Sequence, residues 1–342
     1  MAKLRVMSNF HTLQGDFPGM GEIELVKYPQ DEVGWKDRFR LFFKSFKCDY
    51  LLVMYEFPTL LLFGLLKIIL PFHKCRLVSV DTILNTPRGF AQKLMHPLKV
   101  LALKKVHLHL MFFHNTSGLT RVYKIHPSRF RYIPFKINSY EKAISTESTD
   151  EGFVFTGGVS RRDYDTFVEA IQGLDFPIKM IAGDPELLEH HGSLPLNVDR
   201  LPENVELFTD FNPGRFSKFM ASARVIVLPI REDFLGGAGI SVYLEAMAYR
   251  KCVIVTRGPG NEGLLNNDEA IIVPASDPIA MREAIRRAYT DDEYRKGFGE
   301  RGYQYAISLG GEDKLIENCA EVLFDDFAGR SARSSNTPQQ VS

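Results

Sequence analysis

Short apolar runs alternate along this chain with segments whose apolar residues recur at helical spacing. The runs are LRVMSNF (4–10), DYLLVMY (49–55), CRLVSVD (75–81) and VHLHLMFF (106–113) in the first half, and FVFTGG (153–158), IKMIAGD (178–184), VELFTDF (205–211), ARVIVLPI (223–230) and KCVIVTRG (251–258) in the second. Such runs are typical of buried strands. Strands that alternate with helices predict parallel sheets covered on both faces. We therefore expect an α/β fold with two doubly wound domains.

The polar segment NSYEKAISTESTDEG (138–152) divides the two halves and is typical of an exposed linker. The length of 342 residues suits two domains of ordinary size. We expect an N-terminal, acceptor-binding domain over 1–138, a C-terminal, nucleotide-binding domain over 150–302, a helix over 303–327 that packs back toward the first domain, and a flexible tail over 328–342.

The composition excludes several classes of protein. With 45% hydrophobic and 25% charged residues, the chain is neither disordered nor a disulfide scaffold. The four cysteines lie far apart and form no CxxC pair or metal-ligand spacing. The N-terminus lacks the apolar block of a signal peptide. We expect reduced thiols and a cytoplasmic location.

The charge is divided unevenly between the two halves. Residues 1–137 hold 21 Lys and Arg against 9 Asp and Glu, whereas residues 138–342 hold 21 against 33. A basic half attracts anionic partners, although the two halves could instead attract each other. We expect an anionic membrane surface as a partner, and no nucleic acid.

The segment RGFAQKLMHPLKVLALKKV (88–106) combines cations with Leu, Met and Phe and contains no acid. Such a segment can lie on an anionic membrane, although a helix that covers a sheet also needs an apolar stripe. The apolar segment 57–72 is too short to span a bilayer and is interrupted by Lys67, which favours a buried or interfacial helix. The expected association with the membrane is therefore peripheral.

The stretch DFLGGAGISVYLEAMA (233–248) follows a predicted strand and contains a glycine-rich loop and a helix that begins near Ile240. Ligands of open parallel sheets bind beyond the carboxyl ends of the strands, where glycines allow backbone N–H groups to approach an anion at a helix N-terminus. The residues Gly236, Gly237, Ala238 and Gly239 fit a cradle for a diphosphate.

Glu245 lies in the same helix, on the face of Ser241. A carboxylate repels phosphate but accepts hydrogen bonds from two neighbouring hydroxyl groups, such as those of a ribose. The loop and the acid together predict a nucleoside diphosphate as the ligand.

Three segments resemble the donor-binding domain of GT-B glycosyltransferases of the glycosyltransferase family four type: EAMA (245–248) followed by CVIVT (252–256), GPGNEGLLNNDEAIIVPASDP (258–278), and FVFTGGVSRRDYDTFVEAI (153–171). The resemblance covers about residues 150–320. It implies two Rossmann-like domains that face a cleft, and transfer of a sugar from a nucleotide sugar, a UDP-sugar by preference, to a lipid-linked or polysaccharide acceptor. It also implies retention of the anomeric configuration.

The resemblance assigns donor-binding roles to several residues. It places a cation, here Arg162, at the head of the first helix, facing the donor diphosphate, and it gives Glu245 the ribose. The remaining donor-side positions are Gly157, Gly158, Gly183, Asp184, Asp210 and Phe211. Asp184 could equally cap the helix that follows it. Family members often carry a second glutamate eight residues before this one, where the chain has Gly237.

Asp163 and Asp165 form a DxD pattern, by which other glycosyltransferases hold a metal ion. Because the pair follows two arginines at a helix start, we interpret it as helix capping and expect no metal and no cofactor apart from the co-substrate. On the acceptor side, Asp81 and His114 end strands and are catalytic candidates beside Arg162 and Glu245.

The loop that contains Gly15 and Asp16 could admit the acceptor. Two other functions stay open: a sugar-nucleotide-binding protein without catalysis, which the absent glutamate favours, and a nucleotide-sugar epimerase on the same fold.

Overall fold

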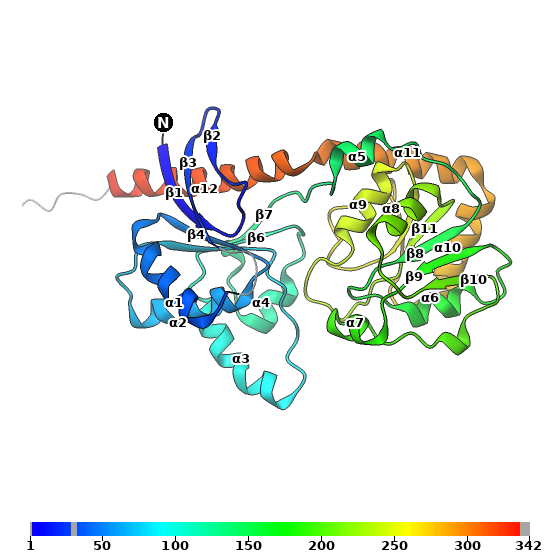
Figure 1. The fold of residues 1–342 in the computed structure, drawn as a ribbon, viewed down its shortest axis with the longest axis horizontal. Helices are drawn as coiled ribbons and strands as arrows, with labels where there is room; N and C mark the ends of the chain where they lie inside the picture. The colour runs from blue at the N-terminus through cyan, green and yellow to red at the C-terminus, as the bar shows by residue number, and fades with distance from the viewer. Residues whose placement is uncertain (1, 29–32, 336–342) are drawn as a thin grey trace, which may run out of the picture. The chain divides into compact units, whose positions relative to one another are not determined.

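The computed structural model describes residues 2–28 and 33–335, which divide into two compact units. Unit 1 comprises residues 1–112, 116–134 and 313–342, and unit 2 comprises residues 113–115 and 135–312. Each unit is built around one sheet, called sheet A in unit 1 and sheet B in unit 2 (Figure 1).

Sheet A has the strand order β2-β3-β1-β4-β5-β6-β7. Its strands are β1 (Ala2–Ser8), β2 (Gly15–Phe17), β3 (Gly21–Lys27), β4 (Tyr50–Met54), β5 (Arg76–Val80), β6 (Leu108–Met111) and β7 (Phe130–Tyr132). All neighbours pair in parallel except β2, which pairs antiparallel with β3.

The helices of unit 1 are α1 (Trp35–Lys44), α2 (Phe57–Ile69), α3 (Phe90–Leu103), α4 (Ser117–Tyr123) and α12 (Glu312–Ser335), with short 3-10 turns at η1 (Ser45–Lys47) and η2 (Pro127–Arg129). Helices α1, α2 and α3 lie on one side of sheet A and α12 on the other (Figure 1). Both faces of the sheet are therefore covered, which explains why β4 and β5 are apolar along nearly their whole length.

The C-terminal helix α12 is tied to sheet A by Asp326. Its carboxylate accepts hydrogen bonds from Tyr50 Oη at 2.7 Å and from His107 Nε2 at 2.8 Å, and it pairs with Arg76. These partners stabilise the charged form and hold the pKa of Asp326 below its ordinary value, against the opposing effect of burial. Helix α12 is thus part of unit 1.

Sheet B is entirely parallel, with the order β10-β9-β8-β11-β12-β13. Its strands are β8 (Val154–Gly157), β9 (Ile178–Ile181), β10 (Val205–Phe208), β11 (Val225–Leu228), β12 (Cys252–Thr256) and β13 (Ile271–Val273). The helices of unit 2 are α5 (Tyr140–Ser145), α6 (Tyr164–Ile171), α7 (Pro185–His190), α8 (Pro213–Ser222), α9 (Ile240–Ala248), α10 (Pro278–Thr290) and α11 (Asp292–Leu309), with a 3-10 turn at η3 (Val198–Arg200).

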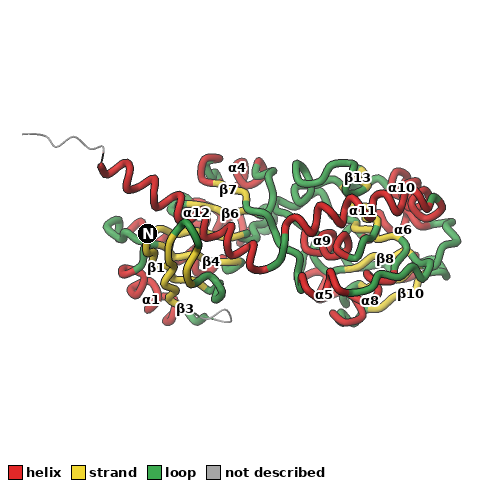
Figure 2. Tube along the Cα trace, turned by 90° about the horizontal axis from the view of Figure 1, so that it is seen from above, coloured by secondary structure: helices red, strands yellow, loops and turns green. Residues whose placement is uncertain are grey.

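A buried core joins α6 and α10 to one face of sheet B. Fully buried side chains such as Phe167 and Ile171 of α6 and Ile285 of α10 meet Val225 and Ile254 of the central strands. Figure 2 shows the helices and strands of this unit interleaved along the trace. The core fixes the carboxyl ends of the strands as a rigid platform.

The nine strands expected from the apolar runs are all present. Their bounds lie within two residues of those expected, except that β9 and β10 end three residues early. Four strands were missed. Three of these, β2, β7 and β13, have three residues each, too few for a pattern. The fourth, β3, begins at a glycine and then alternates acidic and apolar residues. It is not a continuous apolar run, because only part of it is buried.

Two sequence expectations about connections are wrong. The segment 138–152, expected to be a linker, contains the helix α5. The whole segment belongs to unit 2. The final helix does not begin at residue 303. Gly310, with a φ of 72°, ends α11, and α12 runs from Glu312 to Ser335, into the expected tail. The rest of the expected tail, 336–342, lies outside the described residues.

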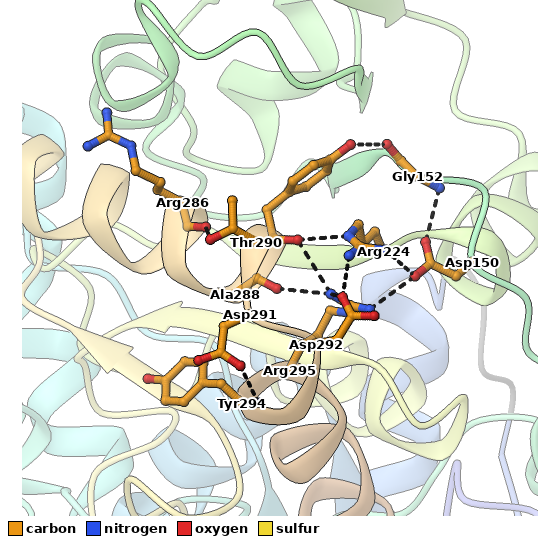
Figure 3. Close-up of polar contacts among 11 residues, drawn as sticks. Asp150, Gly152, Arg224, Arg286, Ala288, Thr290, Asp291, Asp292, Tyr294 and Arg295 are labelled. Atoms are coloured by element: carbon orange, nitrogen blue, oxygen red, sulfur yellow. Dashed lines mark hydrogen bonds and ion pairs between the residues drawn. The ribbon is translucent and has the colours of Figure 1, made fainter.

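The edge of sheet B where the strands begin carries a closed network of charges (Figure 3). Arg224 pairs with Asp150 at 2.8 Å and with Asp292 at 2.5 Å. Arg295 pairs with the same two acids, at 3.3 and 2.8 Å. Asp150, at the end of the expected linker, is thereby joined to α11, and each cation has acidic partners.

The apolar helices in the described part of the chain are all too short to cross a membrane. In particular, α2, the most apolar segment of the sequence, ends after 13 residues.

Candidate functional site

The chain reverses its direction across sheet B between β8 and β11. From β8 it proceeds outward to β9 and β10, and then returns to place β11 on the other side of β8. At such a switch point the loops after the two strands separate and leave room for a ligand at the carboxyl edge. The loops in question are 158–163, after β8, and 229–239, after β11.

Main-chain contacts hold these two loops together. Arg162 and Ile230 form an isolated antiparallel bridge. The backbone N–H of Asp163 donates to Pro229 O at 2.9 Å, and that of Arg231 donates to Arg161 O at 3.0 Å. These bonds therefore hold the two loops at the switch point in a fixed arrangement.

Arg162 lies in the loop after β8 and is almost fully buried, with 2% of its surface exposed. Its guanidinium donates from Nε to Gly157 O at 3.0 Å and from Nη1 to Ser160 O at 2.7 Å. No carboxylate pairs with it among the residues that the structure describes. Burial lowers the pKa of Arg162. A buried cation without an anion is unfavourable, so this side chain suits an anionic ligand.

Gly158 makes this arrangement possible. Its backbone has a φ of 116°, and a Cβ atom there would lie 2.6 Å from Nη2 of Arg162. Any other residue would push the guanidinium out of the loop. Gly157 is similarly constrained, because a Cβ atom would lie 2.7 Å from the ring of Phe216.

Two residues that sequence reasoning missed support Arg162. Ser193 Oγ accepts from the backbone N–H of Arg162 at 2.7 Å and donates to Val159 O at 2.7 Å. The hydroxyl of the buried Tyr164 donates to Gly158 O. Ser193 comes from a loop 31 residues away and carries no local sequence signal.

The glycine-rich loop after β11 ends as expected. Gly239 adopts the left-handed conformation, with a φ of 82°, and α9 begins at Ile240, so the predicted helix start is confirmed. A Cβ atom at Gly239 would lie 2.3 Å from Ile230 Cδ1. A Cβ atom at Gly237 would lie 2.7 Å from Ile240 Cδ1, so a glutamate does not fit at this position without a shift. The backbone of Gly236, Gly237, Ala238 and Gly239 approaches the start of α9, where Ser241 occupies the first turn.

Glu245 is half-buried between α9 and α8. Its Oε1 atom accepts from Ser217 Oγ at 3.2 Å and from Tyr249 Oη at 3.4 Å, and Oε2 has no partner among the described residues. Burial raises the pKa of Glu245, against the two hydrogen bonds. The carboxylate is thus fixed through one oxygen and keeps the other for a donor. Ser217 and Tyr249 were not identified from the sequence.

Of the donor-side residues expected at the ends of β9 and β10, both acids already have partners within the protein. Asp184 caps α7, since its Oδ1 atom accepts from the backbone N–H of Leu187 at 2.8 Å. Asp210 pairs with Arg215 at 2.5 Å. Phe211 is exposed at the end of β10, with its ring 5.4 Å from that of Phe216. Gly183 follows β9, and a side chain there would contact Leu187.

The DxD pair lies at a helix start, as interpreted. Asp163 accepts from the backbone N–H of Thr166 at 3.3 Å and from its hydroxyl at 2.7 Å, and Asp165 lies in the first turn of α6. Asp163 therefore uses its oxygens for capping. Within the described ranges, no three His, Cys, Asp or Glu side chains gather as a metal site would require.

On the acceptor side, Asp81 follows β5 and has a φ of 43°. Its carboxyl group has no hydrogen-bond or ion-pair partner among the described residues, and burial raises its pKa from 3.8 to about 7. His114 is exposed in the segment after β6 that belongs to unit 2, and it lies near Gly263 of the same unit, where a Cβ atom would be 3.5 Å from Cδ2 of the ring. Both residues remain candidates.

The expectation for Gly15 and Asp16 is wrong. They form the edge strand β2, in which Asp16 pairs with Glu22 near the start of β3. Because β3 runs parallel to β1, this position is at the edge where the strands begin, not at their carboxyl ends. The glycines of this segment serve a hairpin, a possibility that the sequence pattern does not separate from a binding loop.

Comparisons with known proteins bear on the family and the fold. Residues 142–305 match the family model of glycosyl transferases group 1. An uncharacterized glycosyltransferase of Methanocaldococcus jannaschii, MJ1178, is 27% identical over 178 residues, which are 51% of this chain and 49% of that protein. The chain thus spans about half the length of the curated relative that it matches.

Two solved structures are similar over most of the chain. Sucrose-phosphate synthase from Thermosynechococcus elongatus has a TM-score of 0.61 at 17% identity, covering 89% of this chain and 84% of its own. HepE of Anabaena, in complex with UDP and glucose, has a TM-score of 0.64 at 14% identity, covering 88% and 86%. Two Rossmann-like parallel-sheet domains and these neighbours establish the GT-B fold.

Proposed function

We propose that this chain transfers a sugar from a nucleoside diphosphate sugar to an acceptor, which the match of residues 142–305 to the family model of glycosyl transferases group 1 supports. One observation carries the proposal. The guanidinium of Arg162 is buried at the switch point of sheet B, and no carboxylate among the described residues pairs with it. In the transfer, the bond from the anomeric carbon to the diphosphate breaks and leaves its electrons on the diphosphate. The acceptor hydroxyl oxygen bonds to that carbon and loses its proton.

The donor binds along the carboxyl edge of sheet B. Its diphosphate lies against the loop from Gly236 to Gly239, where the start of α9 contributes partial positive charge. Arg162 adds a full positive charge beneath it. Charge on the diphosphate grows as the sugar departs, so this guanidinium stabilises the transition state more than the bound donor.

The nucleoside lies toward α8 and the end of β10. Glu245 Oε2 accepts from the ribose hydroxyls, and the exposed ring of Phe211 offers a surface for the base. We propose uridine as the base, which the UDP in the HepE structure supports. Retention of configuration is supported by the family resemblance alone.

The transfer proceeds without a metal ion. Asp163 is committed to capping α6, and Arg162 supplies the positive charge that a metal would otherwise bring to the diphosphate. Excess EDTA should therefore leave the rate unchanged. Loss of activity that manganese restores would contradict this part of the proposal.

The acceptor belongs to unit 1, whose basic charge suits a lipid-linked sugar with an anionic carrier or an acidic polysaccharide. Asp81 is the candidate for contact with the acceptor hydroxyl, because a carboxyl group with a pKa of about 7 can take up or release a proton near neutral pH. His114 is a second candidate.

We propose peripheral contact with the cytoplasmic face of an anionic membrane, which α3 and the residues after it support. The exposed apolar side chains Phe90, Leu94 and Leu101 of α3 accompany the exposed cations Lys93, Lys104 and Lys105 and the partly exposed Lys99. Each cation near an anionic surface contributes about 1 kcal/mol, and the attraction fades within a Debye length of about 8 Å. Binding through these cations should be released by high salt.

The function is tested by incubating the protein with a lipid extract and a panel of nucleotide sugars and identifying new glycosylated products by mass spectrometry. The matched control is Arg162→Met, which keeps the length of the side chain without its charge. A product that depends on one donor and on Arg162 supports the proposal. Donor binding without any product would favour the sugar-nucleotide-binding protein, which the glycine at position 237 permits. An altered sugar on the nucleotide would favour the epimerase.

A further inference from the structure

Helix α1 carries a line of exposed aromatic side chains that the sequence pattern did not reveal. Trp35, Phe39 and Phe43 recur every four residues and expose 56%, 44% and 62% of their surface. The opposite face of the helix buries Leu41 and Phe42. Residues four apart lie on one face of a helix, so α1 is apolar on both sides.

The line continues onto neighbouring elements. The ring of Phe46 in η1 stacks 6.3 Å from that of Phe43 and lies 6.2 Å from that of Phe72, which follows α2 and exposes 65% of its surface. We call Trp35, Phe39, Phe43, Phe46 and Phe72 the aromatic ridge. Exposed apolar groups that are contiguous to this extent mark an interaction surface more often than a plain protein surface.

The ridge is held on a rigid support. Beneath it, the buried ring of Phe42 stacks on that of His73 at 4.5 Å and meets Phe63 edge-on at 5.2 Å. At the start of α1, the guanidinium of Arg38 lies 5.2 Å from the ring centre of Trp35 and pairs with Glu56 at 2.7 Å. The ridge is therefore preorganised and is not a set of loose side chains.

Cations surround the ridge. Lys36, Arg40, Lys44 and Lys47 are exposed in α1 and η1. The one acid of α1, Asp37, is bonded to Arg40 at 3.2 Å. An apolar face bordered by Lys and Arg, with a tryptophan at its end, is the pattern of a helix that lies in the interface of an anionic membrane.

A second copy of the chain fits this surface less well. Two ridges facing each other would bring their bordering cations together, and like charges across an interface cost binding energy. An anionic bilayer instead meets both the aromatic rings and the cations.

We propose that α1 inserts the aromatic ridge into the headgroup region of an anionic bilayer and anchors unit 1 there. Helices α1, α2 and α3 lie on the same side of sheet A (Figure 1), with α2 in contact with both α1 and α3. The inference deepens the proposed function and rests on it for the membrane-linked acceptor, because a lipid-linked sugar would be presented to unit 1 at this surface.

Trp35 allows a direct test because it is the only tryptophan in the sequence. Its fluorescence, excited where tyrosine does not absorb, reports on the ridge alone. Titration with vesicles of anionic phosphatidylglycerol should shift the emission to shorter wavelength and protect it from acrylamide quenching. Vesicles of neutral phosphatidylcholine should cause a much smaller shift.

Co-sedimentation with the same vesicles separates the ridge from α3. The wild-type protein should keep part of its binding in high salt, because apolar insertion is not screened. The double variant Phe43→Ser, Phe72→Ser should bind about tenfold more weakly for each ring removed and should be released completely by salt. The matched control is Ile279→Ser, which removes an exposed apolar side chain from α10 in unit 2 and should leave binding unchanged.

Three results would overturn the inference. They are binding to anionic vesicles without a shift of the Trp35 emission, complete release of the wild-type protein by salt, and a blue-shifted emission before lipid is added that disappears on dilution. The second result would assign all binding to α3, and the third would indicate a second copy. None of these readouts uses a donor or acceptor, so failure of the glycosyl transfer would show separately as absence of product.

Discussion

Arginines at the two edges of sheet B have opposite kinds of partner. Where the strands begin, Arg224 and Arg295 share Asp150 and Asp292, and every charge has a partner in the protein (Figure 3). Where the strands end, Arg162 is at least as deeply buried, but among the described residues its guanidinium bonds only to backbone carbonyl oxygens.

The difference separates a structural arginine from one kept for a ligand. A paired cation contributes to stability and offers little to an anion. An unpaired buried cation costs stability and is retained where binding or catalysis needs its charge. The comparison therefore supports the proposal that an anionic group of the donor binds at the carboxyl edge, and substitutions at the two edges test it.

The largest effect is expected for Arg162→Met in the transfer reaction. Removing a charge that acts mainly on the departing diphosphate should lower the turnover rate about 100- to 1000-fold, with a much smaller change in KM for the donor. Steady-state kinetics with the identified donor measure both constants. Equal losses in affinity and turnover would mean that Arg162 only binds the donor.

The next largest effect is expected for Arg295→Met at the other edge. Loss of this buried partner leaves Asp150 and Asp292 to Arg224 alone and should lower the free energy of unfolding by about 2 kcal/mol, measured by urea denaturation. Donor affinity should not change. The control is Arg286→Met, since the side chain of Arg286 points away from the network (Figure 3) and should cost less than about 0.5 kcal/mol.

Asp81 is the acidic counterpart of Arg162, because no cation pairs with its carboxyl group among the described residues. Burial raises its pKa to about 7, which predicts that stability depends on pH. Between pH 4 and 7 the unfolded chain releases this proton while the folded protein keeps it, so the free energy of unfolding should fall across that window. Because the side chain is partly exposed, we expect a loss of about 2 kcal/mol, not the full effect of the shift. Asp81→Asn should remove the loss and melt at a higher temperature than the wild type at pH 8 but not at pH 4.

The smallest effect is expected for Glu245→Gln. The amide retains one oxygen acceptor but replaces the other with a donor that meets the ribose hydroxyls poorly, so affinity for the nucleoside diphosphate should fall about tenfold. Isothermal calorimetry measures it, with Glu283→Gln on the exposed face of α10 as the control. An unchanged affinity would show that Glu245 does not bind the ribose.

Much of the fold follows from local pattern, whereas the site does so only in part. Buried parallel strands are continuous apolar runs, so β4, β8 and β11 are legible from sequence, but the three-residue edge strands are too short to be read. The glycine-rich loop and the start of α9 were predictable because positive φ requires glycine and Gly239 provides it.

The rest of the site depends on contacts between distant residues. Ser193 reaches the backbone of Arg162 from a loop with no distinctive pattern. The sequence also does not predict that Arg162 has no acidic partner in the part of the chain that the structure describes, because Asp163 and Asp165 follow it closely. The hairpin at Gly15 and Asp16 has the glycines of a binding loop but lies at the wrong edge, because strand order and not composition decides which edge a loop occupies.

The central claim, that the unpaired charge of Arg162 is kept for a diphosphate, is tested most directly by calorimetric titration of UDP into three proteins at one salt concentration: the wild type, Arg162→Met and Arg295→Met. UDP carries the charge that develops as the sugar leaves. We expect Arg162→Met to lose about 100-fold in affinity for UDP, because the guanidinium no longer meets the charge of the diphosphate. We expect Arg295→Met to keep its affinity for UDP and to melt at a lower temperature than the wild type. Equal UDP affinities for the wild type and Arg162→Met would contradict the account.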